Sequence, residues 1–161
     1  MRTKITAVLI ASVLIFTLTG CSSSKKSIDT DTFLDTMEGL GYAARGTGQT
    51  DSKADSVRVN SEDNQYNVTC SVFKEKEAAV KLYDDTVTAA KHFAEDDSYD
   101  LSVKESGSGN YQKISMNGKT IDVNKYIVYV RVDNVIIVAT AKDNGETDIA
   151  EINSVIKELG Y

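Results

Sequence analysis

Residues 126–141 read YIVYVRVDNVIIVATA, two runs of apolar, mostly β-branched residues joined by Asp133-Asn134. β-branched and aromatic residues favour extended strands, and Asp and Asn are common at the centre of tight turns. A two-residue turn at this pair predicts an antiparallel hairpin. Its register would place three apolar pairs opposite one another: Val132 with Val135, Val130 with Ile137, and Val128 with Ala139.

This hairpin is apolar on both of its faces. The side opposite Val128, Val130 and Ile137 carries a second apolar set, here named the candidate partner face: Ile127, Tyr129, Ile136 and Val138. A hairpin at the centre of a sheet has this pattern when helices cover it above and below. The pattern also fits a face that stays partly open and docks a protein partner, a second copy of the chain or an apolar ligand. The sequence leaves both interpretations open.

Several segments upstream of the hairpin also have strand character. In residues 65–73 apolar and polar side chains alternate, which is typical of a half-buried strand, and residues 57–60 and 99–103 show shorter patterns. Asn117-Gly118 is the strongest hairpin signal in the chain, because both residues tolerate a positive φ. It predicts a turn between strands over 111–116 and 119–123.

The apolar phase changes between Val123 and Tyr126, since Ile121 and Val123 are odd-numbered while the apolar residues from Tyr126 to Val132 are even-numbered. A strand keeps its apolar side chains on one face only while this phase is kept. We therefore predict a bulge or a turn near Asn124-Lys125.

Three helices are predicted from apolar positions at helical spacing. The first begins at Asp29 or Thr30 and ends at Gly41, the second covers residues 75–95, and the third ends at the C-terminal Gly160. The predicted fold class is α+β. It comprises an antiparallel sheet with about three helices packed mainly on one face, in the order α-β-β-α-β-β-β-β-α.

The chain begins with the features of an export signal. Arg2 and Lys4 are basic, and the 14 residues from Ile5 to Leu18 carry no charge. At a rise of about 1.5 Å per residue such a helix is roughly 21 Å long, shorter than the ~30 Å hydrocarbon core of a bilayer. The segment therefore predicts a cleaved leader rather than a permanent membrane span.

The leader ends in Leu18-Thr19-Gly20-Cys21, which resembles the lipobox of bacterial lipoproteins. The resemblance covers residues 1–21 and implies that the Cys21 thiol receives a diacylglycerol and that the bond between Gly20 and Cys21 is cut. Membrane lipid is then a partner through acylated Cys21. The predicted organisation is a signal peptide over residues 1–20, a lipidated Cys with a flexible tether over 21–28, and a single α+β domain over 29–161.

The same resemblance implies a location at the outer face of the cell membrane, attached by lipid. Ser22 is not the Asp that retains lipoproteins in the inner membrane of Gram-negative cells, so an outer membrane is expected if the source has one. The mature domain is similar in general pattern to small uncharacterised lipoproteins of Gram-positive bacteria. That likeness implies no functional residues.

The net charge and the cysteine content argue against nucleic acid as a partner and against a disulfide within the mature chain. Removal of the leader leaves 161 − 20 = 141 residues with 18 − 2 = 16 basic and 24 acidic side chains, a net charge of about −8. An acidic chain without a basic patch argues against nucleic acid as a partner. If Cys21 carries lipid, Cys70 is left alone, so no disulfide is expected within the mature chain.

No catalytic, metal-binding or cofactor-binding constellation is predicted. His92 is the single histidine, and Cys70 occupies an inward strand position that suits an inert core thiol. One Cys and one His cannot complete the four-ligand set of a zinc site. The acidic residues, among them Asp84, Asp96 and Asp100, lack the spacing of a calcium loop and indicate a solvated charged surface.

The sequence therefore favours a non-enzymatic binding or accessory module at the cell surface, whose ligand is an unknown protein or small molecule. The alternative is a cell-envelope hydrolase with an unrecognised carboxylate site. A deep pocket with carboxylates converging around Asp84, Asp96, Asp100 or His92 would favour the hydrolase.

Overall fold

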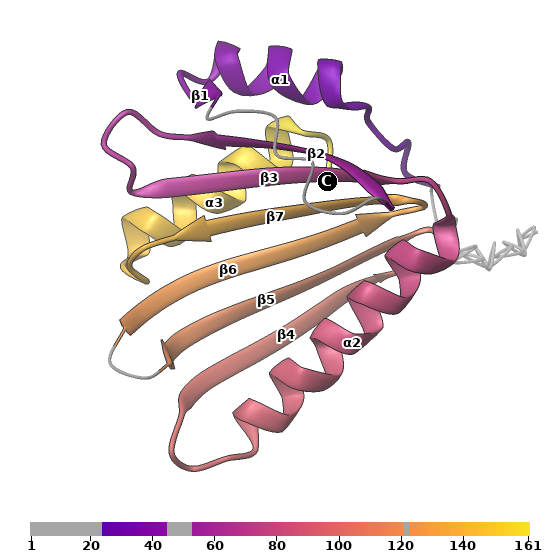
Figure 1. The fold of residues 1–161 in the computed structure, drawn as a ribbon. Coiled ribbons are helices and arrows are strands. Elements are labelled where there is room, and N and C mark those ends of the chain that lie inside the picture. The colour runs from indigo at the N-terminus through magenta and orange to yellow at the C-terminus, as the bar shows by residue number, and fades with distance from the viewer. Residues whose placement is uncertain (1–23, 45–52, 121–122) are drawn as a thin grey trace, which may run out of the picture.

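A computed structural model describes residues 24–44, 53–120 and 123–161, which form three helices and a seven-stranded antiparallel sheet (Figure 1). The helices are α1 (Thr30–Gly39), α2 (Lys76–Ala94) and α3 (Glu146–Glu158). The strands are β1 (Ala43–Ala44), β2 (Ala54–Asn60), β3 (Tyr66–Phe73), β4 (Asp100–Ser108), β5 (Tyr111–Thr120), β6 (Val123–Val132) and β7 (Val135–Ala141). The predicted α+β class and order are confirmed, with the two-residue β1 as an addition.

The hairpin of β6 and β7 lies inside the sheet, as predicted. The strand order is β1-β2-β3-β7-β6-β5-β4, so each strand of this hairpin has a neighbour on both sides. Asp133 has a φ of 52°, the left-handed conformation that the two-residue turn requires. The three predicted apolar pairs are confirmed, beginning with Val132 opposite Val135.

Helices cover both faces of the sheet. Phe33 and Met37 of α1 and Ile152 and Ile156 of α3 pack against one face, while α2 packs against the opposite face through residues that include Tyr83. Figure 1 shows α2 in front of the sheet and α3 behind it. The prediction that helices lie mainly on one face thus describes α1 and α3, whereas α2 accounts for the second apolar face of the central hairpin.

The helix ends follow from their capping residues. Of the two candidates for the start of α1, Asp29 is the cap, and its Oδ1 accepts a 2.7 Å hydrogen bond from the backbone N–H of Thr32. Gly41 and Gly160 both adopt positive φ values, 82° and 91°. The Tyr after each glycine donates its backbone N–H to a carbonyl of the last turn, the Schellman arrangement. The repeated Leu-Gly-Tyr endings therefore fold alike.

The predicted turn at Asn117-Gly118 is wrong. Both residues lie inside β5, whose pairing with β6 continues to Thr120 opposite Val123, so the connection falls at residues 121–122, outside the described part of the chain. Gly118 instead lies where β4 approaches closely. A Cβ built there would overlap the Asp100 carbonyl and lie 2.8 Å from Leu101 Cα. A neighbouring strand, and not a turn, requires this glycine.

The predicted bulge or turn near Asn124-Lys125 is also wrong, since both residues lie within β6 and pair with Lys119 and Gly118. Val123 and Tyr126 both lie in β6, so the apolar phase changes within a continuously paired strand. None of the helices formed by the described residues has the length and apolar character needed to cross a bilayer.

Candidate functional site

The candidate partner face is divided by α2. Ile136 is only 2% exposed and packs with Ala79 and Tyr83, and Val138 is half-buried against the same cluster. For Ile136 and Val138, the interpretation that a helix covers this face of the hairpin is therefore correct. Ile127 and Tyr129, further along β6, are also half-buried but line a cavity between α2 and the sheet.

This cavity, which we call the α2 pocket, has a volume of about 250 Å³. It lies between the second half of α2 and strands β4, β5 and β6, and it is lined by Thr86, Ala89, Ala90, Phe93, Leu101, Met116, Gly118, Lys125, Ile127 and Tyr129. Phe93 is 44% exposed, and its ring meets that of Tyr99 edge-on with centroids 5.2 Å apart.

The chemistry of the α2 pocket suits a small apolar group. Its polar groups are the hydroxyls of Thr86 and Tyr129 and the ammonium of Lys125. Burial raises the pKa of the Tyr129 hydroxyl, so this group is neutral at physiological pH. The volume is below the ~300–1,000 Å³ typical of sites for drug-sized ligands. An apolar side chain of a partner, or a comparably small molecule, is therefore the occupant of suitable size.

A second hollow, which we call the tyrosine cleft, has a volume of about 640 Å³ beside the β2–β3 turn. It is lined by Leu40, Gly41, Tyr42, Ser61, Glu62, Asp63, Tyr66 and Glu151. The Tyr42 hydroxyl donates to Glu151 Oε1 at 3.1 Å, and the Tyr66 hydroxyl donates to Asp148 Oδ1 at 3.1 Å. Burial, reinforced by the nearby Glu151 charge, raises the pKa of Tyr42. Both tyrosines are therefore neutral donors.

Asp63 in the tyrosine cleft is held in its ionised form. Its Oδ1 accepts hydrogen bonds from Ser61 Oγ at 2.6 Å and from the Gln65 backbone N–H at 2.9 Å. These two bonds lower the pKa of the Asp63 carboxyl. A general acid needs a raised pKa to keep its proton at neutral pH. The lowered pKa of Asp63 therefore does not suit the role of a general acid.

The acidic residues and the histidine singled out in the sequence do not converge. Asp84, Asp96, Asp100 and His92 are exposed and line neither of the two cavities. Among the residues described, no group of three or more His, Cys, Asp or Glu side chains is placed to hold a metal ion. Gly20 and Cys21, the predicted cleavage and lipidation residues, lie outside the described ranges, as does the rest of the leader.

Cys70 lies in β3 with no exposed surface and packs in the core beneath α1 and α3. Burial, with a smaller contribution from the Asp29 charge, raises the pKa of the Cys70 thiol to about 12. The reactive species of a cysteine is the thiolate.

We therefore expect Cys70 to resist alkylation by iodoacetamide in the folded protein at pH 8 and to react rapidly in guanidinium chloride. Mass spectrometry of a Cys21→Ser variant, in which Cys70 is the single cysteine, measures both rates. Equal rates in the two conditions would contradict this prediction.

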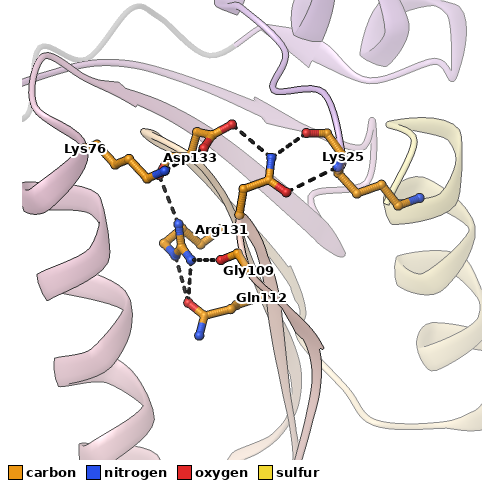
Figure 2. A network of polar contacts seen from close by, with 7 residues as sticks. Lys25, Lys76, Gly109, Gln112, Arg131 and Asp133 are labelled. Atoms are coloured by element: carbon orange, nitrogen blue, oxygen red, sulfur yellow. Dashed lines mark hydrogen bonds and ion pairs between the residues drawn. The ribbon is translucent and has the colours of Figure 1, made fainter. Parts of the chain in front are cut away.

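Arg131 of β6 is a charged side chain that is only 3% exposed. Its Nε and Nη2 donate to Gln112 Oε1 at 2.9 and 2.7 Å, and Nη2 also donates to the Gly109 carbonyl at 3.0 Å (Figure 2). Its Nη1 donates to the backbone carbonyl of Asp133 at 3.3 Å. Neutral acceptors thus satisfy a buried guanidinium.

Asp133 joins this network to two other parts of the chain. Its carboxylate accepts from Lys76 Nζ at 2.8 Å and from Asn110 Nδ2 at 3.0 Å. These two bonds, and less strongly the Arg131 charge, lower the pKa of Asp133. The network therefore ties the start of α2, the β4–β5 turn and the β6–β7 turn together (Figure 2).

The segment before α1 is docked on the same network. The Lys25 backbone N–H donates to Asn110 Oδ1 at 3.3 Å, and its carbonyl accepts from Asn110 Nδ2 at 2.7 Å (Figure 2). Lys25 Nζ donates to the Gly160 carbonyl at 2.9 Å, and the Tyr161 hydroxyl donates to the Lys26 carbonyl at 2.8 Å. Within the segment over 21–28 that was predicted as a flexible tether, Lys25 and Lys26 are thus bonded to the domain.

Sequence reasoning missed three features: the tyrosine cleft, the Arg131 network and the docked segment. A lone arginine between valines in an apolar strand was a usable signal for the second feature, because a charge there must be paired when it is buried. The other two depend on contacts between residues more than 80 positions apart.

No protein-family model matches this chain, and no curated protein sequence matches it.

Proposed function

We propose that this chain is a lipoprotein attached by lipid at the outer face of the cell membrane, where it works as a non-enzymatic binding or accessory module. The observation that carries the proposal is the lipobox cysteine placed directly before a folded domain. Only three residues separate Cys21 from Lys25, which is bonded to that domain through Asn110. Two or more lipid chains on one residue anchor a protein durably, so the polypeptide needs no membrane span of its own.

The α2 pocket is the binding site that we assign to this module. Two residues of the candidate partner face, Ile127 and Tyr129, line this pocket, and most of its other lining residues are apolar. One of them, Phe93, is partly exposed to solvent. The tyrosine cleft gives less support to the alternative, an envelope hydrolase. Its Asp63 has a lowered pKa, and the Glu151 carboxylate accepts the Tyr42 hydrogen bond. A hydrolytic site ordinarily needs a poised acid, base, nucleophile or metal.

Cys21→Ser is expected to abolish both lipidation and cleavage, since a hydroxyl does not replace the thiol that forms the thioether. In a bacterial host, mass spectrometry of the wild-type protein should give an N-terminal peptide that begins at diacylated Cys21. The Cys21→Ser variant should keep residues 1–20 without lipid. Cys70→Val is the matched control and should be lipidated normally. A wild-type chain that begins at unmodified Met1, or that is released into the medium, would contradict the proposal.

Filling the α2 pocket is expected to weaken its binding of apolar probes. Ala89 lines the pocket from α2, and Ala89→Phe places a ring in it. With 1-anilinonaphthalene-8-sulfonate as the probe, we expect the fluorescence enhancement of the folded wild-type protein to fall several-fold in this variant. Ala150→Phe, at an exposed position of α3, is the control and should bind the dye as the wild type does. Equal dye binding by both variants would show that the pocket does not accept apolar groups.

A further inference from the structure

The pairing of the strands orders the floor of the α2 pocket into rows. Lys125 pairs with Gly118, and Gly118 pairs with Leu101, so these three residues form the row nearest the start of β6. Ile127 lies in the second row and Tyr129 in the third. At about 3.3 Å per residue, the four steps from Lys125 to Tyr129 span roughly 13 Å. The floor of the pocket is therefore elongated along β6.

The two ends of this floor differ in exposure. Ile114, the partner of Tyr129 in β5, has no exposed surface, and Ala90 of α2 in the same cluster is 4% exposed. Lys125, at the other end, is half-buried, and Phe93 in the last turn of α2 is 44% exposed. A ligand therefore enters at the row of Lys125 and extends beneath α2 towards Tyr129.

Lys125 is the one charged residue among those that line the α2 pocket. Within the described part of the chain it takes part in no ion pair. The acidic residues that flank the lining residues in the sequence are exposed and do not line the pocket; they are Glu95, Asp96, Asp97 and Asp100. A bound anion is thus paired by Lys125, whereas a bound cation would lie against a like charge.

We propose that the α2 pocket binds a small carboxylic acid, whose alkyl or aryl group lies beneath α2 and whose carboxylate pairs with the ammonium of Lys125. This rests on the proposed function, which assigns binding to this pocket, and it adds the class of ligand. An apolar cavity of about 150 Å³ accepts benzene. The volume of about 250 Å³ therefore suits one ring with a short chain.

Two probes of the same shape test the role of the charge. 4-Phenylbutyrate and its amide, 4-phenylbutanamide, have the same ring and chain, but only the first is an anion. Each is titrated into the ¹⁵N-labelled mature chain, which includes every described residue, and the NMR shifts of the Ala89 and Ile127 amides give the Kd. We expect the carboxylate to bind about tenfold more tightly, since hydrogen bonds between two ions are roughly twice as strong as neutral ones. Equal affinities, or tighter binding of the amide, would overturn the proposal.

Three variants test whether Lys125 supplies the preference. Lys125→Met should weaken binding of the carboxylate about tenfold and leave the affinity for the amide unchanged, while Lys125→Arg should keep most of the preference. Lys119→Met is the matched control, because it removes the same charge from an exposed residue of β5 that does not line the pocket. A preference that persists in Lys125→Met, or that Lys119→Met reduces equally, would overturn the assignment to Lys125.

Further outcomes separate this proposal from the proposed function. N-acetylphenylalanine carries the same ring and carboxylate on a peptide bond, as the C-terminus of a partner protein does. If it binds more tightly than 4-phenylbutyrate, the small-molecule proposal is overturned. If Ala89→Phe weakens both original probes while the wild type binds them equally, the carboxylate preference is wrong and the apolar binding site stands. Absence of binding by both probes at millimolar concentration would overturn both proposals for this pocket.

Discussion

Arg131→Met is expected to lower the free energy of unfolding by about 3 kcal/mol, because it leaves buried acceptors without a donor at about 1–3 kcal/mol each. Gln112 Oε1 loses two N–H donors, and the carbonyls of Gly109 and Asp133 lose one each. Methionine keeps much of the length and apolar contact of the arginine stem, so the change isolates the hydrogen bonds. Urea unfolding followed by circular dichroism measures the effect.

Two further variants separate this effect from a general sensitivity to arginine loss. Arg58→Met, at an exposed position of β2 with a single 3.4 Å bond to Thr69, should change stability by less than about 0.5 kcal/mol. Arg131→Met with Gln112→Leu removes both partners of the strongest contact and should recover part of the loss. If Arg131→Met is as stable as the wild type, the network does not hold the turns together.

Gly118→Ala is expected to cost about 3 kcal/mol or more and to separate β4 from β5 locally, because the atoms that the new Cβ meets are backbone atoms. These atoms are the Asp100 carbonyl and Leu101 Cα, which cannot move aside as a flexible side chain does. The φ of 156° at Gly118 adds strain for any residue with a side chain. Chemical unfolding gives the loss, and amide exchange shows whether β4 loses protection first.

Gly39→Ala is the matched control, since no atom lies within 4 Å of the position of its Cβ. Gly39 is the last residue of α1, where alanine is favoured over glycine by about 0.5–1 kcal/mol. The control should therefore be as stable as the wild type or slightly more so. A Gly118→Ala variant that behaves like Gly39→Ala would show that β4 can move away from β5 without cost.

The prediction at Asn117-Gly118 and the prediction at Asp133-Asn134 used the same rule, yet only the second was correct. Residues such as Asn and Gly indicate only that the backbone can adopt a positive φ at that position. A glycine is also required where a neighbouring strand lies too close to leave space for a Cβ. At Asp133 the turn is local, so its sequence is sufficient. At Gly118 the requirement comes from β4, which the residues of β5 do not reveal.

The candidate site shows the same division. Alternation along β6 and β7 correctly marked Ile127, Tyr129, Ile136 and Val138 as a second apolar face. It did not show that α2 would bury Ile136 and leave a pocket beside Ile127 and Tyr129. Which helix covers a strand, and how far along it, depends on the path of the chain between them.

The residues after Cys21 were predicted as a flexible tether because they have almost no apolar surface to bury. Their docking uses backbone groups of Lys25 and Lys26, bonded to Asn110 and Tyr161. Every residue except proline carries the same backbone donor and acceptor, so such bonds have no signature in the residue types of the segment.

The sequence by itself determined the register of the central hairpin, the helix ends at Gly41 and Gly160, and the two apolar faces of β6 and β7. These features arise from contacts and dihedral preferences within a few residues. Only the tertiary structure decided that α2 covers the second face, that Arg131 is buried with neutral partners, and that Lys25 is held by Asn110 in the β4–β5 turn. Each of these depends on residues distant in sequence, whose approach is set by the packing of the whole sheet.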